Sequence, residues 1–335
     1  MSYIFYIFKS ILLYLLLIPG VSHAKSSSSK NQHQPLIVLL HGLGNHASSF
    51  KSMKQKLEQS CPDAFVFTPK SVEGMKSIEL SISKQAEMIF QEICSKVANL
   101  KDRAILLVGH SQGALTGYAF LKQYEDTLKN IKGLVTLAAP WEGAAGARVD
   151  AAMLAQNLTA SVLKDLRTLS FNLGYAKNEL EKQLMLNVQS NQVVCSRPGG
   201  KDLMPGSAFL AEVRKSLHKE KVPILAIGAG QNNFRALLTK KKARRFKLKA
   251  LNDIYTFFVV GEKRINGRHD MQVSVDSQHA LHIVPKKKKN FTRLLIKDAF
   301  HSSYVLTVPV PKDKAILCHP TALGAVVNFA KTIFK

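Results

Sequence analysis

Ser111 is the residue whose surroundings most clearly indicate chemistry, because it lies in the segment Gly-His-Ser-Gln-Gly at residues 109–113. An apolar run at residues 104–108, typical of a buried strand, leads into the segment, and small and apolar residues typical of a helix follow Gly113. Such a turn lifts a serine hydroxyl above a sheet edge and onto a helix N-terminus, where negative charge is favoured. The pattern predicts a nucleophilic serine, the alternative being an inert serine in a glycine-flanked turn.

A second glycine-rich turn, His-Gly-Leu-Gly at residues 41–44, follows another apolar run at residues 35–40. Glycines there allow the backbone to turn an N–H group towards a reacting carbonyl oxygen. We expect the N–H groups of Leu43 and Gln112 to form a two-donor oxyanion hole. In isolation the turn could be a plain connection after a strand, and the serine segment further along the chain is what favours the functional interpretation.

The elements that must position these turns alternate along the chain. Short apolar runs predict strands near residues 35–40, 104–108, 134–138, 222–228, 254–260 and 292–296. Helices are predicted over 78–100, where apolar residues recur in steps of three and four, directly after Gly113, and over 321–334. Strands alternating with helices predict an α/β fold with an open, mostly parallel sheet and helices on both faces.

Two further segments extend the pattern along the chain. They read Ala-Pro-Trp-Glu-Gly at residues 139–143 and Asp-Leu-Met-Pro-Gly-Ser-Ala-Phe-Leu at residues 202–210. Together with the segments at 41–44 and 109–113, they resemble motifs of bacterial lipases and esterases in the α/β-hydrolase superfamily. The Trp-Glu pair departs from the polar pair usual at that point. The resemblance implies the α/β-hydrolase fold and the cleavage of esters by a serine nucleophile.

The resemblance also implies a triad in the order serine, acid and histidine, with the histidine after the last strand. His301 follows the predicted strand at 292–296, and its loop resembles the catalytic-histidine loop of the family. His279 and His282 precede that strand, and His319 stands before the last predicted helix, where a structural role is simpler. His301 is therefore the predicted base.

The acid is predicted from residues 270–277, which resemble the family's loop Asp-x-x-Val-x-x-x-Ser. The first of these residues, Asp270, would orient the imidazole and stabilise its cation. Asp276 is the second candidate and Asp253 is the third, and each carboxylate could instead serve a turn or cap a helix. Asp270 thus completes the predicted set with the serine and the histidine.

Residues 143–200 interrupt the alternation of strands and helices. The stretch contains no evident strand, and helices are predicted over 149–157 and 160–173. Covers of active sites are often drawn from insertions of this kind. We expect a lid or cap at about residues 144–200, extra packing being the alternative.

The N-terminal residues have the pattern of a secretory signal peptide. Lys9 stands before an apolar run at residues 11–18, and small residues follow up to Ala24. An uncleaved membrane anchor is the alternative, although the run is shorter than the ~20 residues that span a bilayer. We expect a signal peptide at residues 1–24, a disordered leader at 25–34, a hydrolase domain at 35–335, and a periplasmic or secreted protein.

Cofactor chemistry is not indicated by the sequence. No cluster of His, Cys or Asp has the spacing of a metal site, although some bacterial lipases hold a structural calcium. No cofactor is expected.

Export would permit disulfides among Cys61, Cys94, Cys195 and Cys318, and three pairings are open.

The chain is strongly basic, with 47 Lys and Arg against 23 Asp and Glu and a formal net charge of +24. Seven basic residues stand between Lys240 and Lys249, and an uninterrupted basic run extends from Lys286 to Lys289. For an exported protein this surplus favours an anionic membrane surface over nucleic acid, for which no motif occurs. Two solvated loops are the simpler interpretation.

The sequence as a whole predicts an exported serine hydrolase that cleaves carboxylic esters, with acyl lipids as the expected substrates. A thioesterase or an acyltransferase with the same triad is the enzymatic alternative, because an acyl-enzyme reacts with water, thiols or alcohols. The non-enzymatic alternative is a hydrolase-fold protein that binds polyanions or membranes through its basic runs.

Overall fold

A computed structural model describes residues 34–261 and 267–335 of the chain. The predicted signal peptide, and the predicted leader except for Gln34, lie outside these residues. Within the described ranges, no helix is both long and apolar enough to cross a membrane.

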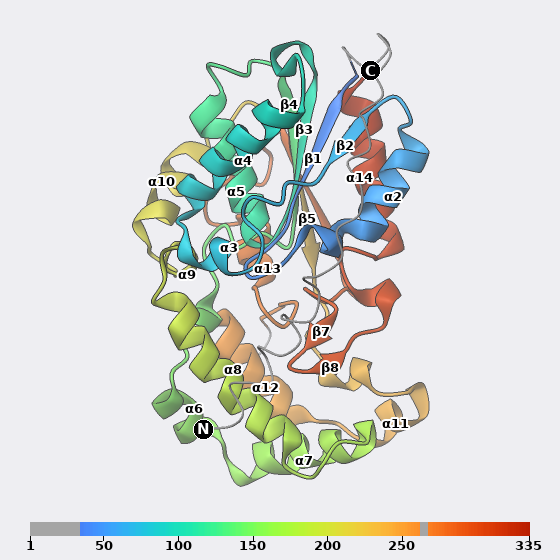
Figure 1. Ribbon diagram of the computed structural model, residues 1–335. Coiled ribbons are helices and arrows are strands. Elements are labelled where there is room, and N and C mark those ends of the chain that lie inside the picture. The colour runs from blue at the N-terminus through green and yellow to red at the C-terminus, as the bar shows by residue number, and fades with distance from the viewer. Residues whose placement is uncertain (1–33, 262–266) are drawn as a thin grey trace, which may run out of the picture. The chain divides into compact units, whose positions relative to one another are not determined.

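Six strands form one sheet in the order β2-β1-β3-β4-β5-β6, and every neighbouring pair is parallel (Figure 1). The strands are β1 (Leu36–Leu40), β2 (Phe65–Phe67), β3 (Ile105–His110), β4 (Ile131–Leu137), β5 (Ile224–Ala229) and β6 (Phe291–Ile296). The prediction of a parallel α/β sheet is confirmed, and the arrangement is that of an α/β-hydrolase.

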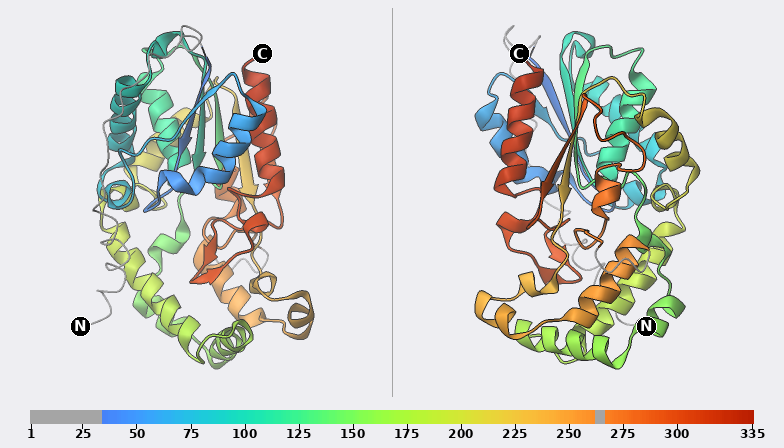
Figure 2. Two further views of the ribbon diagram at one scale, coloured as in Figure 1. Left: turned by 45° about the vertical axis from the view of Figure 1, so that its right-hand side comes forward. Right: turned by 180° about the vertical axis from the view of Figure 1, so that it is seen from behind.

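Both faces of the sheet are buried, which explains why its strands read as continuous apolar runs. In β1, Leu36 and Val38 enter one hydrophobic core, and Ile37 and Leu39 enter the other. The first core is closed by α4 (Ile82–Lys96), α5 (Gln112–Tyr124) and α10 (Ala208–Leu217). The second core is closed by α2 (Lys51–Ser60) and α14 (Pro320–Ile333), on the opposite side of the sheet (Figure 2).

A helical insertion stands between β4 and β5 at the end of the sheet where the strands terminate (Figure 1). It contains η4 (Ala145–Arg148), α6 (Ala151–Asn157), α7 (Ala160–Leu173), α8 (Glu179–Cys195) and α9 (Pro198–Lys201). A third hydrophobic core joins α6, α7 and α8 to α12 (Lys249–Val260). Met271 and Phe300, from the loops that follow α12 and β6, belong to the same core.

The predicted strand at residues 254–260 is wrong, because these residues form the second half of helix α12. The run is rich in aromatic and β-branched residues, which favour strands in isolation. It packs instead against α7, and the carboxylate of Asp165 on α7 accepts a hydrogen bond from the N–H of Leu251 in the first turn of α12 (3.1 Å). Gly261, at φ 79°, ends the helix. Tertiary packing has overridden local preference.

The predicted helix over residues 78–100 is divided in the structure into α3 (Met75–Glu79) and α4. Ser81 caps α4 by accepting a hydrogen bond from the N–H of Lys84. The Gln85 side chain donates to the backbone carbonyls of Ser77 and Leu80 and holds the connection in place. The apolar periodicity was continuous, and it gave no sign of this break.

Candidate active site

Ser111 lies between β3 and α5 with φ 53° and ψ −125°, a conformation that residues other than glycine rarely adopt. Its neighbours must be glycines. A Cβ added to Gly109 would lie 2.4 Å from the carbonyl oxygen of Gly113, and one added to Gly113 would lie 2.1 Å from that of Leu40. The N–H of Ser111 donates to the carbonyl of Leu137 in β4 (2.9 Å), which holds the turn against the sheet.

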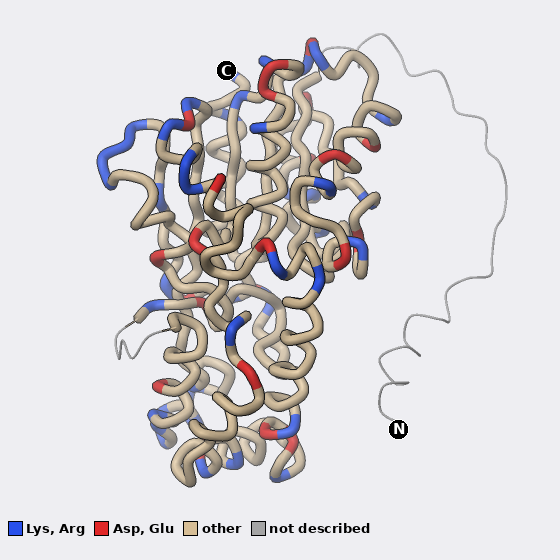
Figure 3. The backbone as a smooth tube through the Cα atoms, turned by 90° about the vertical axis from the view of Figure 1, so that its left-hand side faces the viewer, with Lys and Arg blue, Asp and Glu red and all other residues tan. Residues whose placement is uncertain are grey.

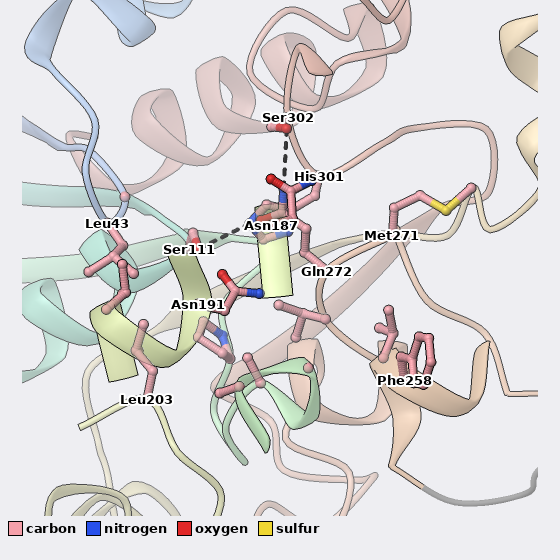
Figure 4. A pocket seen from close by; sticks show the side chains of 18 of the residues that line it. Leu43, Ser111, Asn187, Asn191, Leu203, Phe258, Met271, Gln272, His301 and Ser302 are labelled. Carbon is pink, nitrogen blue, oxygen red and sulfur yellow. Dashed lines mark hydrogen bonds between the residues drawn. The ribbon is translucent and has the colours of Figure 1, made fainter. Parts of the chain in front are cut away.

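The structure brings Ser111, His301 and Asp270 together in one hydrogen-bonded line. The Oγ of Ser111 lies 3.0 Å from Nε2 of His301, and Nδ1 of His301 lies 2.6 Å from Oδ2 of Asp270 (Figure 4 shows the serine and the histidine). With its proton on Nδ1, His301 donates to the carboxylate and accepts from the serine hydroxyl. The three residues come from loops that follow β3, α12 and β6, so distant parts of the sequence meet at one end of the sheet.

The carboxylate of Asp270 is completely buried and held by several donors. Its Oδ1 accepts hydrogen bonds from the N–H groups of Gln272 (3.0 Å) and Val273 (2.7 Å), while Oδ2 faces His301. The N–H of His301 also donates to the backbone carbonyl of Asp270 (3.1 Å). These contacts compensate for burial and fix the orientation of the carboxylate.

The two other candidate acids lie elsewhere. Asp276 stands in the first turn of α13 (Val275–Gln278), and the carboxylate of Asp253 pairs with Lys249 one turn away on α12 (3.0 Å). Within the described residues, neither carboxylate is hydrogen-bonded to His301. Asp270 is the candidate acid that the fold brings to the histidine.

The remaining late histidines have other partners. Nε2 of His279 lies 3.2 Å from a backbone carbonyl of β6, and Nδ1 of His282 lies 2.7 Å from the carboxylate of Glu142. His319 precedes α14, and its Nδ1 accepts a hydrogen bond from the N–H of Thr321 in the first turn (3.2 Å). The expected structural role of His319 agrees with this capping contact.

The two backbone groups predicted for the oxyanion hole flank Ser111. Gln112 follows it directly as the first residue of α5, and Leu43 lies in a loop pressed against it, since a Cβ added to Gly42 would lie 3.1 Å from the Cβ of Ser111. Within residues 34–261 and 267–335, neither the N–H of Leu43 nor that of Gln112 donates a hydrogen bond. Both donors are therefore available to a ligand beside the serine hydroxyl.

The side chain of Gln112 has a second function that the sequence analysis did not anticipate. Its Nε2 donates to the backbone carbonyls of Ser77 and Gly199, each at 3.1 Å, and the side chain is buried. Gly199 belongs to α9, and Ser77 belongs to α3. Gln112 thus ties the turn that carries Ser111 to the helical insertion and to helix α3.

His110, which precedes the serine, was also missed as a site residue. Its Nε2 lies 2.9 Å from the backbone carbonyl of His301, and the two imidazole rings are 5.0 Å apart. Burial away from water, followed by the nearness of His301, lowers the pKa of His110 to about 3. The imidazole is neutral at ordinary pH and donates from Nε2. Only its place inside the serine segment could have indicated this contact.

Ser111 and His301 open into a cavity of about 460 Å³, which lies within the usual size range of small-molecule pockets (Figure 4). Polar side chains line one part of it: Asn45, Asn187, Asn191, Gln272 and Ser302. Aliphatic and aromatic side chains line the rest, among them Val149, Leu184, Val188, Tyr255, Phe258, Val259 and Met271. Helix α8 supplies residues 184, 187, 188 and 191, a helical spacing that the sequence could have revealed.

The structure also places the possible metal ligands and the cysteines of the described residues. In the described part of the chain, no group of three or more His, Cys, Asp or Glu side chains could hold a metal ion. Cys61, Cys94, Cys195 and Cys318 are free thiols, so none of the three disulfide pairings is formed. Cys195 lines the cavity, and burial raises the pKa of its thiol.

Two solved structures illustrate what the fold resembles. Phospholipase PlaB from Legionella pneumophila is 14% identical, with a TM-score of 0.51 over 87% of this chain, and this chain spans 59% of that one. Bacillus licheniformis lipase BlEst2 is 13% identical, with a TM-score of 0.49 over 94% of this chain and 96% of that one. At 14% identity the likeness to phospholipase PlaB concerns the fold alone. No curated protein matches the chain.

A family model described as palmitoyl protein thioesterase matches residues 36–238. The matched span runs from β1 to the end of the 3-10 helix η5 (Phe234–Leu237) and contains Ser111, Leu43 and Gln112. It ends before Asp270 and His301, whose placement is seen in the structure. Since this match covers more than half of the sequence, the chain belongs to the palmitoyl protein thioesterase family, within the α/β-hydrolase superfamily.

Proposed function

We propose that this chain is an exported serine hydrolase that removes long acyl groups from thioesters and esters. The observation that carries the proposal is the hydrogen-bonded line from Ser111 through His301 to Asp270, which opens into a largely apolar cavity. Family membership supports a hydrolase acting on thioesters, and the lipase-like segments support esters. The export part of the proposal rests on the sequence pattern before residue 25.

The proposed reaction begins when Ser111 attacks the acyl carbonyl and His301 takes its proton on Nε2. Asp270 holds the imidazole in the required tautomer and stabilises the imidazolium that forms. The N–H groups of Leu43 and Gln112 donate to the developing oxyanion, and one such donor is typically worth ~10²–10³ in rate. The carbon–sulfur or carbon–oxygen bond then breaks, and the acyl group remains on Ser111.

The leaving group determines how much the histidine must contribute in the second half of this step. A thiol has a pKa of about 8.5, so a thiolate departs with little help. An alkoxide is far more basic and needs the proton held by His301. After the proton on His301 has passed to the leaving thiolate or alkoxide, the neutral imidazole deprotonates water, which attacks the acyl-enzyme, and the proton returns to Ser111 as the fatty acid is released. An acceptor alcohol in place of water would give the acyltransferase alternative.

The cavity wall supports an acyl chain as the retained group. Leu184 and Val188 of α8 face the cavity together with Phe258 and Val259 of α12, and these side chains offer no hydrogen-bond partner to a substrate. Burial of methylene groups contributes about 0.8 kcal/mol each, so affinity should rise with acyl length until the apolar part is filled.

The test uses matched acyl thioesters and oxoesters of short, medium and long chains, with Ser111→Ala as the control. We expect hydrolysis of both classes, a maximum at long chains, and loss of activity in Ser111→Ala. A labelled fluorophosphonate should modify Ser111 in the wild type. Absence of labelling together with equal inactivity of both proteins would contradict the proposal. Mass spectrometry of the protein recovered after expression would show whether the chain starts after Ala24.

A further inference from the structure

The basic residues between Lys240 and Lys249 form an exposed surface, which we call the α11 surface. Helix α11 (Lys240–Arg245) carries five of them, and all seven basic side chains are exposed. Within the described residues only Lys249 forms a salt bridge, with Asp253. Such a density of exposed, like charges is unfavourable in isolation, and it indicates an anionic partner.

An exposed aromatic residue stands beside this surface. Phe171, near the end of α7, has 80% of its surface exposed, more than any other large apolar residue in the described ranges. Asn172 follows Phe171 in the chain, and its backbone carbonyl accepts a hydrogen bond from the Nζ of Lys242 (2.6 Å). This contact brings α11 and the end of α7 together. Phe171 thus adjoins the residue whose carbonyl binds the Lys242 ammonium group.

The outer face of α7 continues the same pattern. Arg167 and Lys164 are exposed and precede Phe171 by one and two helical turns, respectively, so they share its face. Asp165 on the same helix is turned away, since its carboxylate accepts from the N–H of Leu251. Figure 3 shows Lys and Arg at this end of the molecule, and others at the opposite end.

We propose that the α11 surface and Phe171 dock the protein on a lipid bilayer that contains anionic headgroups. Cationic side chains attract such headgroups, and an aromatic ring enters the interfacial region. The proposal deepens the proposed function, because α7 packs against α8, and α8 lines the catalytic cavity. Docking through this end would place the helical insertion, whose α8 lines the cavity, on a membrane that holds acylated substrates.

The structure also distinguishes this surface from the second basic run, Lys286 to Lys289. That run stands just before β6 and lies near Lys219 and Lys221, just ahead of β5, at the amino ends of the parallel strands. Ser111 lies at the carboxyl end of β3. A membrane bound at Lys286 to Lys289 would therefore lie at the wrong end of the sheet for the cavity.

The test measures co-sedimentation of the full chain, carrying Ser111→Ala to prevent turnover, with two kinds of vesicle. One kind contains equal parts of phosphatidylglycerol and phosphatidylcholine, and the other contains phosphatidylcholine alone. The triple variant Lys240→Gln, Lys241→Gln and Arg244→Gln is compared with Lys286→Gln, Lys287→Gln and Lys289→Gln, which removes the same charge. Phe171→Ser is compared with Phe65→Ser, because Phe65 is an exposed phenylalanine on the distant edge strand β2.

We expect binding to the anionic vesicles only. Each cation near the surface contributes about five-fold in partition, so the α11 triple variant should bind up to about 100-fold more weakly. The Lys286 triple variant should change by less than about five-fold. Phe171→Ser should weaken binding about 10-fold, and Phe65→Ser should have no effect. Thermal unfolding of each variant confirms that it is folded.

Equal losses in the two triple variants, or none in the α11 variant, would overturn the proposal. So would an α11 variant that keeps its vesicle binding but loses binding to heparin or to an oligonucleotide, since another polyanion would then be the partner. Vesicle binding requires no catalysis. Failure of this test would leave the hydrolase proposal standing, and an inert but vesicle-binding wild type would refute only the proposed function.

Discussion

The imidazole of His110 donates from Nε2 to the backbone carbonyl of His301 across 2.9 Å. His110, which precedes the candidate nucleophile Ser111, therefore holds in place the histidine that faces this serine. His110 is buried and neutral, and its place at the end of β3 is fixed by the sheet. His301 lies in a loop and has no such support from regular structure. The contact transfers the rigidity of the sheet to the histidine loop.

The first prediction concerns this contact. His110→Leu should lower kcat about 10- to 100-fold and leave KM within about three-fold, because a small displacement of the base is costly in the transition state. His110→Gln, which can still donate to the carbonyl, should recover part of the loss. His279→Gln is the control, since His279 is a buried histidine that also contacts a backbone carbonyl, but one away from Ser111. Equal effects at the two positions would count against a positioning role.

The second prediction follows from the low pKa of His110. Its pKa is about 3 in the folded state, against about 6.5 when unfolded, so between these pH values only the unfolded chain binds a proton. The contribution of His110 to stability is complete above about pH 6.5 and is lost as the pH falls towards 3, by up to about 1.4 kcal/mol per pH unit. Urea unfolding of His110→Leu should show a shallower acid dependence than the wild type, and parallel curves would show that His110 does not titrate in this way.

The third prediction separates the candidate acids. Asp270→Asn should reduce kcat by about 10⁴, because an amide in place of the carboxylate no longer fixes the tautomer or stabilises the imidazolium. Asp276→Asn should leave kcat nearly unchanged, since Asp276 lies in α13 and is not bonded to His301. Steady-state rates on one long-chain thioester decide the matter. A larger loss of kcat in Asp276→Asn than in Asp270→Asn would show that Asp276, and not Asp270, is the catalytic acid.

The fourth prediction addresses the buried side chain of Gln112. Gln112→Leu removes the donor to the carbonyls of Ser77 and Gly199 and should reduce the free energy of unfolding by about 1–3 kcal/mol. Gln123→Leu is the matched control on the same helix, because its contact with the Ser83 carbonyl is exposed, and it should change stability by less than about 0.5 kcal/mol. Chemical unfolding measures both, and equal stabilities would show that the buried contacts contribute nothing net.

The fifth prediction tests the acyl-binding wall. Val188→Trp places a bulky ring in the apolar part of the cavity and should move the preferred substrate towards shorter acyl chains. Val193→Trp is the control on the same helix, since Val193 is 61% exposed and Val188 only 5%. The ratio of kcat/KM for long and short thioesters is the measurement. An unchanged ratio in Val188→Trp would place the acyl chain elsewhere.

Much of the fold could be predicted from the sequence because its signals are local. A buried parallel strand is a short apolar run, and the serine turn needs glycines at fixed positions, so β1, β3 and the turn at Ser111 were evident. Asp270 and His301 could be singled out only through the resemblance to a family. Their approach to Ser111 depends on loops whose course no local pattern specifies.

The sequence-based predictions that failed share one physical cause. Residues 254–260 and the start of α4 both contact distant segments, through the Asp165 carboxylate in the first case and through the Asp202 carboxylate, which accepts from the N–H of Ile82 (2.7 Å), in the second. The contact between His110 and His301 likewise joins residues that are far apart in the sequence. Periodicity reports which face of an element is apolar, but it does not report which partner that face will meet.

Met271 and Phe300 adjoin Asp270 and His301, and both are packed in the hydrophobic core of the helical insertion. The insertion therefore does not fold independently of the loops that carry the catalytic acid and base. Exchanging it for the cap of another hydrolase would loosen the loops that carry the acid and the base as well as the substrate wall. Substitutions in the core of the insertion are therefore expected to change substrate preference and the geometry of proton transfer together.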